Sequence, residues 1–239
     1  MTTLARITIA LILALLFSSC GFDFVNGKKG NGIVQEENRT VNGDFNAVSA
    51  SEGLNVYVTQ GEAFKILVEA DENVIDLIAT DLKDGVLRVH TNENIGRATK
   101  NIYVALPKII ALEASSGADM ITENAIKAES IDLNASSGAD IKITDLRAEK
   151  VNADSSSGAD IEIGGEVITF SSNASSGSSI KANNMVSNTC RARASSGANI
   201  TVNVTESLIA EASSGGDIKY TGMAKVEEKK SSSGSVGQL

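Results

Sequence analysis

The serines and aspartates of one repeated six-residue word are the side chains whose types and spacing could support chemistry. The word reads Ala-Ser-Ser-Gly-Ala-Asp at 114–119, and variants of it recur at 135–140, 155–160, 174–179, 194–199, 212–217 and 231–236. A serine becomes a nucleophile only beside a general base, and no base recurs near these serines. The aspartates carry the hard oxygen ligands that calcium prefers.

The aspartate position of the word predicts a column of polar side chains that face outward. A metal site needs oxygens that converge on one point, whereas a column one residue wide offers them along a line. Ser179 occupies the same position without a charge. Because Asp, Asn and Ser all hydrogen bond to nearby backbone in turns, we favour a turn-stabilising role over calcium binding and expect no metal ion. The predicted outward polar column is Asp119, Asp140, Asp160, Asn199 and Asp217.

Few other residues suit catalysis or cofactor binding. The chain has one histidine, His90, and two cysteines, Cys20 and Cys190, which are too few for a zinc site or a Ser–His pair. We interpret His90 as an ordinary surface or half-buried side chain and Cys190 as a small core residue. The net charge is −9 and no basic stripe is present, which argues against nucleic acid as a partner. We expect no catalytic residue and no cofactor.

The start of the chain is typical of a bacterial lipoprotein signal. An apolar run over 7–17 ends in small residues just before Cys20; the run is too short to span a bilayer but suits a signal peptide. We predict a signal peptide over 1–19, lipid attachment at Cys20 and a flexible, glycine-rich tether over 20–37. The alternative is an ordinary signal peptide that happens to contain Cys20. Glycine rather than aspartate follows Cys20, which resembles lipoproteins of the outer membrane.

The period of the repeated word predicts the fold. Its glycines recur every 18 to 21 residues, whereas helical-hairpin repeats need about 33 residues and propeller blades about 40. Two stretches per repeat alternate apolar and polar residues, which is the pattern of strands with one buried face. We therefore predict an all-β parallel β-helix, or β-solenoid, with coils of about 20 residues. Glycine at each corner allows a positive φ, and the predicted structural turn column is Gly117, Gly138, Gly158, Gly177, Gly197 and Gly215.

The columns on either side of the turn predict the core. The inward column seven residues before each glycine is Ile110, Ile131, Val151, Phe170, Cys190 and Leu208. In the last copy Glu227 and Lys229 fall in apolar columns, so we expect the stack to stop or fray there, although Val226 suggests that a shift by one residue would partly restore it.

The predicted solenoid domain covers 38–239, with the regular repeats in 111–239. Residues 38–110 show less regular alternation, and we interpret them as three irregular coils that cover one end of the stack. The spacing of Val74, Leu77, Ile78 and Leu82 predicts one short helix in this part. Asp71 or Asn73 is expected to cap it.

The segment Val41–Val89, which contains Gly53-Leu54-Asn55 and is followed by IYVALP and the SSGAD words, resembles the putative auto-transporter adhesin, head GIN domain family. Leu54 stands where the family's motif has Ile. The resemblance covers about residues 38–239. It implies a parallel β-helix-like fold, export and an adhesive role, and it implies no catalytic residues.

Two classes of function follow. The first is a non-enzymatic cell-envelope lipoprotein, held at the outer membrane by its lipid, that serves as a scaffold or adhesin-like contact surface for an envelope or extracellular glycan or protein. The second is a carbohydrate-active enzyme or glycan-binding module on a β-helix. An enzyme of that kind needs paired carboxylates and aromatic rings that stack on sugars, and we expect outward aromatics to be nearly missing. The orientation of the domain and its oligomeric state stay open.

Overall fold

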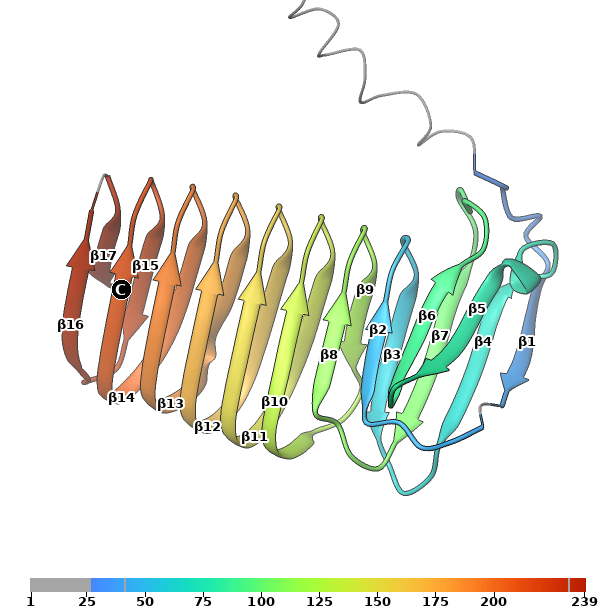
Figure 1. The fold of residues 1–239 in the computed structure, drawn as a ribbon, viewed down its shortest axis with the longest axis horizontal. Helices are drawn as coiled ribbons and strands as arrows, with labels where there is room; N and C mark the ends of the chain where they lie inside the picture. The colour runs from blue at the N-terminus through green and yellow to red at the C-terminus, as the bar shows by residue number, and fades with distance from the viewer. Residues whose placement is uncertain (1–26, 41, 232) are drawn as a thin grey trace, which may run out of the picture.

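Strands stack in parallel along one axis in the computed structural model, which describes residues 27–40, 42–231 and 233–239 (Figure 1). The described residues contain one helical element, the 3-10 turn Ile75–Leu77, and no helix long enough to cross a membrane. The predicted all-β solenoid is confirmed. Its strands are β1 Val34–Arg39, β2 Ala47–Ala50, β3 Asn55–Gln60, β4 Lys65–Asp71, β5 Ile78–Lys83, β6 Val86–Thr91, β7 Lys100–Leu106, β8 Ala111–Ala114, β9 Asp119–Thr122, β10 Ile126–Ala135, β11 Asp140–Ser155, β12 Asp160–Ala174, β13 Ser179–Ala194, β14 Asn199–Ala212, β15 Asp217–Thr221, β16 Lys225–Lys230 and β17 Ser235–Gln238.

Each regular coil has two strand segments joined by the tight turn of the repeated word. Ile161, just after one such turn, pairs with Ile141 of the coil before it, and Phe170 pairs with Val151. The same parallel register continues into β13 and β14. Because neighbouring strands lie about 4.8 Å apart, each coil adds one layer to a continuous stack.

The predicted inward columns form the core, with one exception. Phe170 is 1% exposed and is among the largest fully buried side chains. Ile110 was predicted to point inward but is exposed, and Ile109 is buried in its place. The two lie just before β8, where strand alternation does not hold, although Leu112 inside β8 keeps its register with Leu133.

The turn of the repeated word requires two consecutive residues with positive φ. Ser116 has a φ of 52° and Gly117 a φ of 73°, and the Ala118 N–H donates to the Ser115 carbonyl at 3.1 Å. This is the pattern of a type I′ turn. Serine is destabilised in the left-handed region by roughly 1–2 kcal/mol, so other interactions must hold it there. The positive φ recurs at Ser137, Ser157, Ser176, Ser196 and Ser214 and at the glycine after each.

Hydrogen bonds between neighbouring turns supply that support. The Gly117 N–H donates to the Ser137 carbonyl at 3.1 Å, and the Gly138 N–H donates to the Ser157 carbonyl at the same distance. Backbone groups at each tip are therefore satisfied by the next coil, and the hydrogen bonds between tips form a ladder along the axis of the stack, beside the ladders between the strands. In Figure 1 these tips are the row of narrow loops along one edge of the stack.

The N-terminal end differs from the three irregular coils that the sequence predicted. The coil of β2 and β3 pairs in parallel with β8 and β9 on one side and with β6 and β7, which come later in the chain than β3, on the other. Antiparallel strands then cover this end: β4 pairs with β7, β1 with β4, and β5 with β6. Covering the end protects strand edges from pairing with another chain.

The helix predicted from Val74 to Leu82 is reduced to the 3-10 turn Ile75–Leu77, after which the chain continues as β5. No side chain caps this turn. Asp71 is buried, and its carboxylate instead accepts the backbone N–H groups of Gly32 and Thr99. A buried carboxylate is stable only with such partners, so Asp71 joins the N-terminal segment to the strands beneath it.

The second part of the tether predicted over 20–37, residues 27–37, is folded. Lys28 forms a parallel bridge with Ile95, and the Gly30 N–H donates to the Arg97 carbonyl at 3.0 Å. β1 then pairs with β4 along its whole length. Residues from 27 onward therefore belong to the folded domain, whereas the predicted signal peptide and Cys20 lie outside the described residues.

The last coil continues the stack instead of fraying. Val226 pairs with Leu208 and Val236 pairs with Ile218. Ser233, with a φ of 62°, takes the place of the turn glycine, and Gly234 takes the position that alanine has in most of the other turns. This shift by one residue moves Glu227 and Lys229 out of the apolar columns, although Glu228 then comes into register with Ala210.

We predict that Phe170→Ala lowers the free energy of unfolding by roughly 3–5 kcal/mol, because it leaves a cavity in a closely packed column. Ile168→Ala is the matched control on the same strand, since Ile168 is 54% exposed and its loss should change stability by less than about 0.5 kcal/mol. Urea denaturation of both variants measures the difference. Equal losses would contradict the burial pattern of β12.

Candidate functional site

A long shallow groove runs along the solenoid beside the row of turns. One stretch of about 440 Å³ extends from Asn134 to Ser195, and a second of about 450 Å³ continues from Arg193 to Ser231. At about 4.8 Å per coil, the two together extend about 24 Å. In each coil the groove is lined by the half-exposed serine two residues before the turn glycine, such as Ser136 or Ser175, and these small side chains leave it open.

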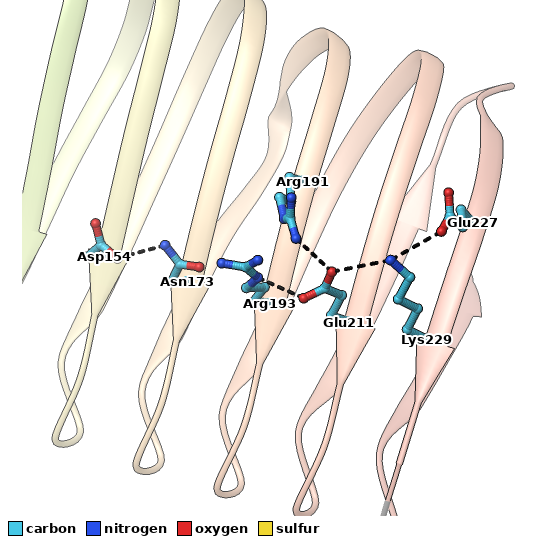
Figure 2. Close-up of polar contacts among 7 residues, drawn as sticks. All are labelled: Asp154, Asn173, Arg191, Arg193, Glu211, Glu227 and Lys229. Atoms are coloured by element: carbon cyan, nitrogen blue, oxygen red, sulfur yellow. Dashed lines mark hydrogen bonds and ion pairs between the residues drawn. The ribbon is translucent and has the colours of Figure 1, made fainter.

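The polar column that borders the groove is organised by contacts between coils (Figure 2). The Asn173 side-chain amide donates to Asp154 at 2.8 Å. Two coils further on, Glu211 accepts hydrogen bonds from Arg193 at 2.7 Å and from Arg191 at 2.9 Å. The Lys229 ammonium lies 3.8 Å from the same carboxylate. Each polar side chain is therefore held by a neighbour one coil away.

Glu211 is the centre of the charged part of this groove. The hydrogen bond from Arg193 is the main reason that the pKa of Glu211 lies below its ordinary value; partial burial opposes this effect, and the charges of Arg191 and Lys229 add to it. Three cations surround this carboxylate, and Lys229 also contacts Glu227 at 3.2 Å. The cluster therefore has one more positive than negative side chain, on a chain whose net charge is −9.

The predicted polar column lies in the strand segments that follow the turns. Asp119, Asp140 and Asp160 are in register on adjacent coils, and Ser179, Asn199 and Asp217 continue the row. The Lys181 ammonium contacts the Asp160 carboxylate at 2.8 Å. Burial, and then the charge of Asp140, raise the pKa of Asp119.

The hydrogen bonds do not support the turn-stabilising role that we predicted for these aspartates. Turn backbone is contacted instead by serine side chains at buried positions: the Ser155 hydroxyl donates to the Ala159 carbonyl at 2.7 Å, and the Ser178 hydroxyl donates to the Ser155 carbonyl at 2.8 Å. In the described part of the chain, no three His, Cys, Asp or Glu side chains are grouped so as to hold a metal ion.

The remaining candidates lie apart from the groove. The His90 ring contacts Asp81 at 2.8 Å in the pair of β5 and β6. Cys190 is buried in the core, and burial raises the pKa of its thiol to about 12, so the nucleophilic thiolate is not formed near neutral pH. The glycines of the turn column lie at the tips, with positive φ from Gly117 to Gly215.

Sequence reasoning missed two features. Tyr57 and Tyr103 pair across β3 and β7 with ring centroids 5.0 Å apart, although outward aromatics were expected to be nearly missing. The two rings come together because β3 pairs with β7, which does not follow it directly in the chain, and no sequence repeat indicates this pairing. Ala-Ser-Glu-Gly-Leu-Asn at 50–55 is also a copy of the repeated word: Glu52 and Gly53 have positive φ, and the Gly53 N–H donates to the Ser116 carbonyl.

We predict that Asp119→Asn raises the thermal unfolding midpoint at neutral pH. The raised pKa of Asp119 means that its ionised form is less stable in the folded protein than in the unfolded chain. The gain should shrink as the pH falls through this raised pKa, and it should disappear below the usual aspartate value of about 3.9.

The control for this experiment is Asp217→Asn, in the same row but next to the neutral Asn199 and paired with Lys219 at 3.6 Å, which should give no gain. A loss of stability in Asp119→Asn at neutral pH would contradict the account. A chelator should leave the melting of the unmodified chain unchanged; a drop beyond about 5 °C would show that the aspartate row holds calcium.

Solved structures share this fold. A putative adhesin from Bacteroides fragilis superposes with a TM-score of 0.81 at 22% identity, covering 89% of this chain and 100% of that one. A putative adhesin from Parabacteroides merdae gives 0.70 at 20% identity, and a putative lipid binding protein from Parabacteroides distasonis gives 0.71 at 19%; each comparison covers 90% of this chain and 100% of the other. No curated protein matches the chain.

The sequence profile of one family covers most of the solenoid. The profile described as "Putative auto-transporter adhesin, head GIN domain" matches residues 44–224. This range begins just before the first turn, which contains Gly53-Leu54-Asn55, and ends within the final coils. The chain belongs to the putative auto-transporter adhesin, head GIN domain family.

Proposed function

We propose that the protein is a non-enzymatic cell-envelope lipoprotein whose solenoid provides an adhesin-like contact surface. The observation that carries this proposal is the groove beside the turns, which presents polar side chains in register over about 24 Å. The family to which the chain belongs is described as an adhesin family, and this description agrees with such a role at the cell surface or in the envelope.

The groove suits an extended polar partner, namely an envelope or extracellular glycan or protein. Its side chains are already held by hydrogen bonds such as those of Arg193 and Arg191 to Glu211. Side chains fixed before binding lose less conformational entropy when a partner docks. Repetition of similar groups on successive coils lets several weak contacts act together along one polymer, which favours binding through avidity.

A lipid at Cys20 would place this surface at the far end of the molecule. Six residues lie between Cys20 and Gly27, and the seven residue-to-residue steps span at most about 25 Å when fully extended. Lys28 is bridged to Ile95 at the end covered by antiparallel strands. The regular coils that carry the groove extend away from that end (Figure 1).

Attachment assays with cells that express the full chain test the contact surface. We predict that Arg193→Gln combined with Glu211→Gln reduces attachment to a glycan array and to host or envelope surfaces about tenfold or more, because the pair lies in the groove. Lys142→Gln combined with Glu162→Gln is the matched control, since it removes an ion pair of 3.2 Å from the other face of the coils. Equal attachment by both double variants would contradict the proposal.

Two further experiments test the lipid anchor and the non-enzymatic role separately. Cys20→Ala should leave the protein uncleaved or in the soluble fraction; correctly processed protein that stays with membranes would place the anchor elsewhere.

The alternative function, a carbohydrate-active enzyme, predicts new reducing or unsaturated ends when the full chain is incubated with acidic polysaccharides. The appearance of such ends would replace the contact-surface proposal with an enzymatic one.

A further inference from the structure

A hollow of about 700 Å³ opens where the row of turns is interrupted. Between β6 and β7 the chain makes a loop over 92–99 instead of the two-residue turn of the other coils. The hollow lies between this loop and the neighbouring turn tips, and we call it the loop hollow. Its lining includes Glu52, Glu93, Arg97, Lys100 and Ser116.

The loop that borders the hollow is fixed by the surrounding chain. The Asn92 N–H donates to the Leu77 carbonyl at 2.8 Å, and the Gly96 N–H donates to the Lys28 carbonyl at 3.1 Å. Ile95, at the centre of the loop, is buried. A loop that is held in place in this way presents a preformed site.

Lys100 is the most unusual charge at this site. Among the lysines whose side chains the structure describes, it alone is not exposed. None of the ion pairs of the described residues includes Lys100 or Arg97. Burial lowers the pKa of Lys100. A partly desolvated ammonium without a counter-ion gains a charge-assisted hydrogen bond when an anion binds.

The other groups that line the hollow indicate which class of anion would bind there. The Glu52 carboxylate is already engaged, because it accepts the Thr91 N–H at 2.6 Å and the Thr91 hydroxyl at 2.9 Å. Glu93 and Ser116 line the hollow as well and can hydrogen bond to hydroxyl groups. A sugar acid matches this set, since its carboxylate suits two cations and its hydroxyls suit the acceptors. A phosphate with more than one negative charge would be repelled by the two glutamates.

We propose that the loop hollow binds a carboxylate-bearing sugar of an acidic glycan, with its carboxylate on Lys100 and Arg97. This proposal deepens the contact function proposed above and rests on it, but it concerns a different site, at the opposite end of the row of turns from Lys229. The available volume of about 700 Å³ exceeds what one small anion needs, so the neighbouring sugars of the chain have room to enter.

Titration calorimetry of the full chain in detergent, with a tetramer of galacturonic acid, tests the proposal. The methyl ester of the same tetramer is the neutral control for the ligand, and Lys108→Gln, at an exposed lysine, is the matched control for the protein. We expect the acid to bind at least tenfold more tightly than its ester. Lys100→Gln should weaken binding of the acid at least tenfold, and Lys108→Gln should leave it unchanged. Affinity should also fall as the pH rises through the lowered pKa of Lys100.

Several results would overturn this inference. They are equal binding of the ester, unchanged binding by a folded Lys100→Gln variant, or a dissociation constant weaker than about 10 mM for the acid. Lys100-dependent binding to phosphatidylglycerol vesicles without binding of the tetramer would assign the hollow to a lipid instead. If the tetramer does not bind but attachment still depends on Arg193 and Glu211, only the sugar-acid site is contradicted. If the Arg193/Glu211 double variant attaches as well as its control, the contact function itself is contradicted.

Discussion

The regular part of this molecule depends on a chain reversal that every coil makes within two residues, at the same place in the stack. The reversal requires two left-handed residues in succession, which glycine accepts without steric cost and serine does not. Ser137 and Gly138 have φ values of 55° and 71°. Their conformation is held because the Gly138 N–H bonds to the Ser157 carbonyl of the next coil. Each turn is thus stabilised by its neighbour, as expected for a structure in which repeats contact only the repeats beside them.

The same constraint shapes the core and the surface. Close to the tip the two strand segments converge, and the side chains before and after the turn, such as Ala174 and Ala198, are small and buried. Larger side chains, above all Phe170, pack further from the tip. Outside, half-exposed serines such as Ser175 line the groove, and polar side chains bordering it bond across coils, as Asn173 does to Asp154. The repeated word therefore specifies a stable coil and a polar groove together, and the proposed contact function rests on that groove.

Much of the fold follows from the sequence because periodicity reports burial directly. Alternation around Ile141 and Val151 was sufficient to assign both faces of a coil, and the register of β11 with β12 agrees with it. The alternation misplaced Ile110, because that residue lies outside a strand. The order of strands at the N-terminal end was not predictable, since β2 pairs with β6 and β8, which do not follow it directly in the chain, and no local pattern encodes such a choice. The loop hollow has no sequence signal either, because Lys100 and Glu52 meet only through this pairing.

Hydrogen exchange at the turn glycines tests the central claim most directly. The amides of Gly117, Gly138, Gly158, Gly177 and Gly197 are on exposed tips but donate to serine carbonyls of the next coil. If the turns form a continuous ladder, these amides should exchange as slowly as those of neighbouring strand residues such as Ile141, because exchange then requires two coils to separate. The exchange of each amide would be followed by nuclear magnetic resonance. Exchange at the rate of an unstructured glycine-rich peptide, with the strand amides still protected, would contradict the account.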